Sequence, residues 1–187
     1  MVPGMNVQPT PIAGVFVVET TAFVDRRGSF ARLFCERELE KILGDRSIVQ
    51  INHSRTAAAG AVRGLHYQRP PAAEMKLVRC LSGRAWDVVV DLRIDSPTFL
   101  KWHAEELTPQ SNRMMVIPEG CAHGFQTLAA NTELLYLHTA FFTPEAEGAV
   151  RFDDPLLAIP WPLQVADLSD RDRRHPAITP DYQGIAV

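Results

Sequence analysis

The chain has 187 residues, a formal net charge of −3 at neutral pH, and 46% hydrophobic and 22% charged residues. These values are ordinary for one globular domain and give no general electrostatic reason to expect a nucleic acid or a membrane as partner. No apolar run is long enough to span a bilayer, and the N-terminus lacks a signal-peptide pattern. The three cysteines form no CxxC pair. We therefore expect a cytoplasmic protein with free thiols.

Short strands separated by turn residues dominate the predicted elements. In chain order, the predicted strands cover residues 14–19, 47–53, 61–67, 76–81, 85–93, 101–107, 113–117, 123–128 and 132–139. In residues 85–93, hydrophobic side chains occupy every second position from Trp86 to Leu92, which is typical of a strand buried on at least one face. Only residues 36–43 show a helical pattern, with Gly44 as a plausible end. The many short strands indicate an all-β sandwich or barrel.

After residue 143 the chain becomes rich in proline, aspartate and arginine. The same segment holds Trp161 and several aliphatic residues, which is unusual for a disordered tail. We therefore expect a single domain over residues 1–187, with a barrel core at 12–143 and an ordered extension at 144–187 packed on that barrel.

The segment Arg63-Gly64-Leu65-His66-Tyr67-Gln68 is followed closely by Lys76, one of only three lysines in the chain. A histidine base, a lysine that holds an oxyanion and an arginine that binds phosphate together suit the enolisation of a ketone on a phosphorylated substrate. An ordinary strand end with a solvated lysine and arginine is the alternative interpretation, and the segment alone does not separate the two.

Two further side chains are candidates for this chemistry. His123 lies in Pro118-Glu119-Gly120-Cys121-Ala122-His123-Gly124-Phe125, where glycines allow the backbone to approach a ligand closely. Tyr136 shares a strand face with His138 and donates a proton if that face lines a pocket. The alternatives are a turn histidine bonded to a nearby carbonyl and a packing tyrosine with a tethered hydroxyl.

Sequence motifs for cofactors are absent. The chain has neither GxGxxG nor GxxxxGK[ST], so any phosphate must be held by side chains, with Arg27 and Arg63 as candidates. A solvated Arg26-Arg27 pair is the alternative. His66 is followed by Tyr67 and Gln68 rather than by a second histidine and a carboxylate, so we expect no catalytic metal.

Together these segments resemble the dTDP-4-dehydrorhamnose 3,5-epimerase family, cupin-fold enzymes that act on dTDP-4-keto-6-deoxy sugars. The resemblance covers about residues 12–176. It rests on Asp25-Arg26-Arg27-Gly28-Ser29-Phe30, Gln50-Ile51-Asn52-His53-Ser54, Arg63-Gly64-Leu65-His66-Tyr67-Gln68, Lys76-Leu77-Val78-Arg79, Pro118-Glu119-Gly120-Cys121-Ala122-His123-Gly124-Phe125, Leu135-Tyr136 and Leu168-Ser169-Asp170-Arg171-Asp172.

The resemblance implies a cupin-type double-stranded β-helix, or jelly roll, and specific roles for matching residues. It implies His66 as the base, Asp172 as the carboxylate that orients it, Lys76 as the group that stabilises the C4 enolate, and Tyr136 as the acid on the other face of the sugar. The residues implied to contact the substrate are Arg27, Phe30, Gln50, Asn52, Arg63, His123 and Phe142. It further implies a homodimer, in which the segment from Arg27 to Phe30 reaches the partner, and no metal or organic cofactor.

The chain departs from the family pattern at three places, and these keep other functions open. Arg32 replaces a glutamate that helps to read the base, Leu137 replaces a common lysine, and Phe141-Phe142 replaces a Tyr-Tyr pair. A phenylalanine stacks as a tyrosine does but makes no hydroxyl hydrogen bond. The alternatives are a mono-epimerase or 3,4-ketoisomerase acting on another nucleotide sugar, a non-catalytic sugar-nucleotide-binding cupin, and a metal-dependent cupin.

Overall fold

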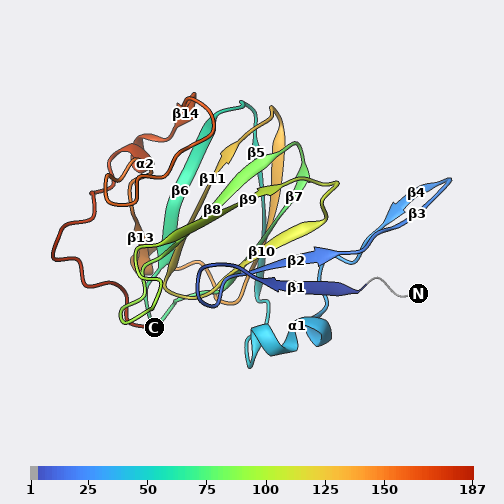
Figure 1. The fold of residues 1–187 in the computed structure, drawn as a ribbon, viewed down its shortest axis with the longest axis horizontal. Coiled ribbons are helices and arrows are strands. Elements are labelled where there is room, and N and C mark those ends of the chain that lie inside the picture. The colour runs from blue at the N-terminus through green and yellow to red at the C-terminus, as the bar shows by residue number, and fades with distance from the viewer. Residues whose placement is uncertain (1–3) are drawn as a thin grey trace.

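A computed structural model describes residues 4–187 of the chain. Its two main sheets are almost entirely antiparallel and face each other (Figure 1). The first sheet has the order β1-β2-β10-β7-β12-β5, formed by Met5–Pro9, Phe16–Thr20, Arg113–Ile117, Lys76–Ser82, Thr132–His138 and Gln50–Thr56. The second has the order β13-β6-β11-β8-β9, formed by Glu147–Ala149, Ala61–Gln68, Cys121–Thr127, Ala85–Asp91 and Trp102–Leu107, and β14 (Asp167–Leu168) pairs with β6. This is the jelly roll expected from the sequence.

A separate two-stranded hairpin, β3 (Phe23–Asp25) and β4 (Gly28–Phe30), projects away from both sheets (Figure 1). All of its residues are exposed. Within one chain the hairpin therefore has no hydrophobic surface on which to pack.

The helix α1 spans Glu36–Leu43, as the sequence predicts. Its apolar positions Leu39 and Leu43 are buried against the first sheet, whereas the intervening charged residues face solvent. Gly44 follows with a φ of 57°, a left-handed conformation that glycine adopts without strain. The position and the end of this helix thus follow from local pattern.

The main core fills the space between the two sheets. Val78, Met115 and Leu134 of the first sheet pack with Val89 and Phe125 of the second, and all five side chains are almost fully buried. Burying such side chains contributes roughly 1.5–3 kcal/mol each relative to leaving them exposed. The alternation of side chains along each strand places one set of residues in this core and the other set on the outer faces.

The outer face of the second sheet is covered by the C-terminal segment. Val150, Leu157, Ile159 and Ile178 pack with Leu65 and its apolar neighbours on this face. The extension is ordered, as expected, and contributes β13, β14 and the short helix α2 (Asp170–Arg173). It follows that β8 is buried on both faces, which explains the continuous burial from Asp87 to Asp91.

Candidate active site

One cavity of about 510 Å³ opens between the sheets and is lined by strands of both sheets and by the C-terminal extension. Seven of the eleven predicted site residues line it: Asn52, Arg63, His66, Lys76, His123, Tyr136 and Asp172. They come from β5, β6, β7, β11, β12 and α2, so only the folded topology brings them together.

The close approach of β6 and β11 forms the back of this site. A Cβ added at Gly64 would lie only 2.5 Å from the Cα of Gly124, and Gly64 has a φ of 128°. The register of the two strands shifts just after His123, which pairs with His66 across the ladder. Glycines at both positions therefore allow two neighbouring histidine-bearing strands to approach each other closely.

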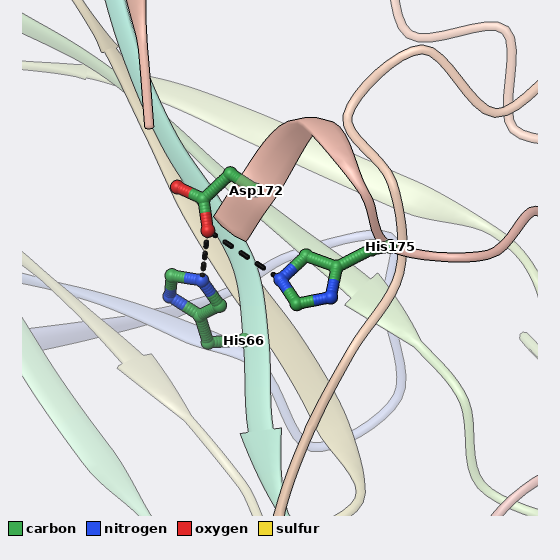
Figure 2. A group of neighbouring side chains, drawn as sticks. All are labelled: His66, Asp172 and His175. Carbon is green, nitrogen blue, oxygen red and sulfur yellow. Dashed lines mark hydrogen bonds and ion pairs between the residues drawn. The ribbon is translucent and has the colours of Figure 1, made fainter. Parts of the chain in front are cut away.

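His66 and Asp172 form a hydrogen-bonded pair (Figure 2). Nε2 of His66 donates to Oδ1 of Asp172 over 2.7 Å, and the backbone N–H of Gly64 donates to the other carboxylate oxygen over 3.3 Å. Burial alone would raise the pKa of Asp172, but the hydrogen bonds from His66 and from the backbone N–H of Gly64 outweigh it, and the pKa is lowered. An ionised carboxylate at this position fixes the orientation of the imidazole and stabilises its protonated form.

Two local features place Asp172 beside β6. The strand β14 pairs in parallel with Ala61 and Val62, which brings the extension to the start of β6. Ser169 then caps α2, because its hydroxyl accepts a hydrogen bond from the backbone N–H of Asp172 over 3.0 Å. The Ser-x-x-Asp sequence thus sets both the helix start and the position of the carboxylate.

Tyr136 projects from β12 into the same cavity. Its hydroxyl lies 3.1 Å from the hydroxyl of Ser54, and its ring meets the ring of His123 edge-on at 6.1 Å. Burial raises the pKa of Tyr136 well above its usual value, so the phenol remains protonated at neutral pH. The side chain is therefore suited to donate a proton.

Lys76 begins β7 and is nearly buried. Its Nζ atom lies 3.1 Å from Oε1 of Glu74, and the two side chains are 12% and 6% exposed. An ammonium group in such a partly desolvated position interacts strongly with developing negative charge. Lys76 is thus placed to stabilise an enolate.

His123 has a carboxylate partner that sequence reasoning missed. Its Nε2 atom lies 2.7 Å from Oδ1 of Asp87, which is fully buried in β8. A carboxylate within an apolar strand was the available signal, because a buried carboxylate needs a partner. The pairing favours a positioned histidine in the cavity wall over a turn histidine bonded to a carbonyl.

Four predicted residues lie outside this cavity in the single chain. Arg27 and Phe30 are on the exposed β3–β4 hairpin, where Arg27 forms an ion pair with Asp25. Gln50 accepts a hydrogen bond from the backbone N–H of Phe142, which is about half exposed. The chain on its own therefore does not bring these four residues to the base and acid.

Sequence reasoning also missed His175 and Glu74. It missed as well the contact between Nδ1 of His138 and Oε2 of Glu74, which are 2.7 Å apart. Nε2 of His175 lies 3.5 Å from Oδ1 of Asp172, and its ring meets that of His66 edge-on at 5.9 Å (Figure 2). The spacing of His175 three residues after Asp172, just beyond a short helix, was the available signal.

Within residues 4–187, His66, Asp172 and His175 are the one group whose ligand atoms are close enough to hold a metal, all within 4.8 Å of one another. Two ligands on a tetrahedral zinc with bonds of about 2.0–2.1 Å lie about 3.3 Å apart. The 2.7 Å between His66 and Asp172 is shorter and matches a charge-assisted hydrogen bond. The geometry therefore favours an acid–base pair over a metal centre.

The cavity of this jelly roll combines a carboxylate-oriented histidine, a protonated tyrosine and a lysine. This combination is typical of acid–base enzymes that move protons at carbon. Comparison with known proteins gives a more specific assignment. The family model described as dTDP-4-dehydrorhamnose 3,5-epimerase matches residues 9–179. The chain belongs to this family.

Relatives and solved structures agree with this assignment. The dTDP-4-dehydrorhamnose 3,5-epimerase of Pseudomonas aeruginosa is 46% identical over 165 residues, which cover 87% of this chain and 90% of that protein. The crystal structure of the Bacillus anthracis enzyme, with TDP and PPi bound, has a TM-score of 0.90 and 38% identity, and covers 94% of this chain and 100% of that one. ChmJ of Streptomyces bikiniensis, a 3'-monoepimerase in complex with dTDP-quinovose, has a TM-score of 0.85 and 32% identity, with 91% and 86% covered.

Proposed function

We propose that this protein epimerises a dTDP-4-keto-6-deoxyhexose at C3, C5 or both. The observation that carries the proposal is the cavity in which His66, paired with Asp172, shares the walls with Tyr136 and Lys76. Family membership supports the same reaction and the same nucleotide sugar.

The geometry supports a reaction through an enolate. Nε2 of His66 is hydrogen-bonded to Asp172, so Nδ1 is the ring nitrogen that removes the proton from the carbon next to the C4 ketone. The electron pair of the broken C–H bond forms a double bond to C4, the π electrons of the ketone move to the C4 oxygen, and the ammonium of Lys76 stabilises the resulting enolate. Tyr136 then donates its proton to the same carbon from the opposite face. The electrons of the C=C bond form the new C–H bond, and those on oxygen re-form the ketone. Solvent restores both side chains, so no oxidant or cofactor takes part.

Substrate binding is assigned to residues around and beyond this cavity. Arg63 and His123 line the cavity, and we assign Arg63 to the pyrophosphate and His123 to the hexose or its phosphate. Arg27 is assigned to the pyrophosphate, and Phe30, Gln50 and Asn52 are assigned to the nucleotide. Phe142 is assigned to the nucleotide or sugar, because an aromatic ring stacks on planar or apolar faces.

We further propose a homodimer in which each hairpin completes the partner's site. Phe30 and Val24 of the hairpin are 69% and 79% exposed, an unusual exposure for large apolar residues on so short an element. A two-stranded hairpin without further packing is only marginally stable in water, so a partner surface would stabilise it.

A cytoplasmic location is also proposed. It is supported by the absence of disulfides among the three cysteines. No helix within residues 4–187 has the length and apolar character that a bilayer-spanning segment requires.

A single-centre epimerase is the second candidate. The likeness to a 3'-monoepimerase favours it, as do Arg32 and Phe142, where the family pattern has a glutamate and a tyrosine. Leu137, where the family often has a lysine, packs with helix α1 and does not line the cavity. Because epimerising one carbon requires only a changed sugar pose or a bias in reprotonation, both candidates use the same catalytic residues.

Product analysis tests the proposal and separates the two candidates. Incubation with dTDP-4-keto-6-deoxyglucose, borohydride reduction of the ketone and hydrolysis give sugars whose C3 and C5 configurations are identified by chromatography. Inversion at both carbons shows a 3,5-epimerase, and inversion at one carbon shows a mono-epimerase. Unchanged configuration at both carbons, with the nucleotide sugar still bound in a binding assay, would indicate a non-catalytic cupin instead.

A further inference from the structure

Lys76 has a carboxylate partner that does not itself line the cavity. Glu74 Oε1 lies 3.1 Å from Nζ of Lys76, and the Glu74 side chain is only 6% exposed. Lys76 lines the cavity, whereas Glu74 lies behind it. Glu74 therefore contacts the amine and does not reach a bound sugar.

The other oxygen of Glu74 is fixed as well. Nδ1 of His138 donates to Oε2 of Glu74 over 2.7 Å, and Nδ2 of Asn52 donates to Nε2 of His138 over 3.2 Å. The result is a polar chain that runs from Asn52 through His138 and Glu74 to Lys76. Because both of its oxygens have a partner, the Glu74 carboxylate is held in one orientation and can hold the ammonium group of Lys76 in place.

The pairing of β5, β12 and β7 holds this series of hydrogen-bonded side chains in place. β12 lies between β5 and β7, and His138 is in register with Gln50 on one side and with Lys76 on the other. Burial alone would raise the pKa of Glu74, but the hydrogen bond from His138 and the charge of Lys76 outweigh it, and the pKa is lowered. Glu74 is thus an anion in a nearly dry setting, and its removal leaves a buried ammonium without a counter-ion.

The arrangement also leaves donors for the substrate. An ammonium group has three N–H donors, and Glu74 takes one of them. The other two are available to the cavity, where the C4 oxygen of a substrate develops negative charge.

We propose that Glu74, itself held by His138, is a positioning residue that fixes the Lys76 ammonium for enolate stabilisation. The proposal rests on the proposed epimerase function. It predicts that Glu74 acts only through Lys76 and therefore affects turnover rather than substrate affinity.

The test is a double-mutant cycle that compares wild type, E74Q, K76A and E74Q/K76A, with kcat and KM measured for each protein. The amide of E74Q keeps an acceptor for His138 but removes the negative charge next to Lys76. We expect E74Q to lower kcat about 10- to 100-fold, less than the loss of a direct oxyanion donor, with KM changed by no more than about twofold. In the K76A background, E74Q should cause no further loss of kcat.

Two further variants make the result specific. E133Q removes a carboxylate from β12 that pairs with His53 and Arg55 instead, so its activity should equal that of wild type. E74D keeps the negative charge, but its side chain is one methylene shorter, so the carboxylate lies farther from Lys76. Its kcat should therefore fall between those of wild type and E74Q. E74D replaces E74Q in the cycle if thermal melting shows that E74Q does not fold.

An unchanged kcat in E74Q, or an equal loss in the wild-type and K76A backgrounds, would overturn the inference alone. A wild-type protein that exchanges no carbon-bound proton of the substrate would refute the proposed function, and this inference with it.

Discussion

Nε2 of His66 donates a hydrogen bond to Oδ1 of Asp172 over 2.7 Å, although 106 positions of sequence separate the two residues. The bond exists because the extension returns to the start of β6 through the short parallel pairing of β14. The imidazole of His66 is thus oriented by a residue of the C-terminal extension. Loss of the extension would remove the orienting carboxylate together with the cover of the second sheet.

Replacing Asp172 by asparagine separates orientation from charge. D172N keeps the size of the side chain but removes the negative charge that stabilises a protonated His66. We expect kcat to fall by about 10²–10⁴-fold, the usual worth of general acid–base catalysis, with a much smaller change in KM. Steady-state kinetics of D172N checks this. A kcat within about twofold of wild type would contradict the assigned role, since uniform binding effects leave kcat unchanged.

Tyr136 should be needed for inversion but not for proton removal. In Y136F the base remains, so deuterium from the solvent should still enter the substrate, whereas formation of the epimer should fall sharply because the opposite face has no acid. Mass spectrometry of the recovered sugar, together with its configuration, measures both outcomes. Loss of exchange and inversion to the same extent would place Tyr136 elsewhere in the reaction.

The raised pKa of Tyr136 also predicts a pH dependence. A phenol is an acid only while it is protonated, and a raised pKa moves its deprotonation to higher pH. We therefore expect no loss of kcat from tyrosine ionisation below about pH 10, the usual pKa of the side chain. Absorbance of ionised tyrosine near 295 nm, compared between wild type and Y136F, measures this directly. A signal at neutral pH that disappears in Y136F would contradict the expectation.

The three thiols should differ in reactivity. Cys80 and Cys121 are buried, and burial raises the pKa of Cys80 to about 11 and that of Cys121 to about 12, whereas Cys35 is half-buried. Because the thiolate is the reactive form, Ellman's reagent should modify about one thiol in the native protein and about three after denaturation. Rapid modification of all three thiols in the native protein would contradict the packing of β7 and β11.

Subunit complementation tests whether the hairpin acts on the partner's site. R27A and H66A are each expected to be weakly active. If Arg27 serves the other subunit, a mixed dimer has one site with both residues intact, and random mixing restores about a quarter of wild-type activity. Co-expression of the two variants with different tags allows the mixed dimer to be isolated. Activity no greater than that of the separate variants would show that Arg27 acts within its own chain or not at all.

The strands and the helix were accessible from sequence because their patterns are local. The helix is observed at Glu36–Leu43 as predicted, and the strands predicted at 113–117 and 76–81 are observed at Arg113–Ile117 and Lys76–Ser82. Alternating apolar residues and glycine or proline turns determine these elements. The fold class, including the ordered extension, is confirmed.

Elements that depend on distant partners were not predicted. β1 (Met5–Pro9) has no buried residue and pairs with β2, and the two residues of β14 are too few to show a pattern. The same limit applies to the site. Asp87 in an apolar strand signals that some partner exists but does not identify it as His123, and Glu74 is recognisable only once Lys76 is seen beside it.

The most direct test of the account is proton NMR of dTDP-4-keto-6-deoxyglucose in deuterium oxide with wild-type protein and with H66A. We expect wild type to remove the C3 signal, the C5 signal or both, because His66 exchanges the abstracted proton with solvent, and H66A to leave both signals intact at the same protein concentration. Loss of either signal at the wild-type rate in folded H66A would contradict the assignment of the base. No exchange in wild type would contradict the epimerase proposal itself.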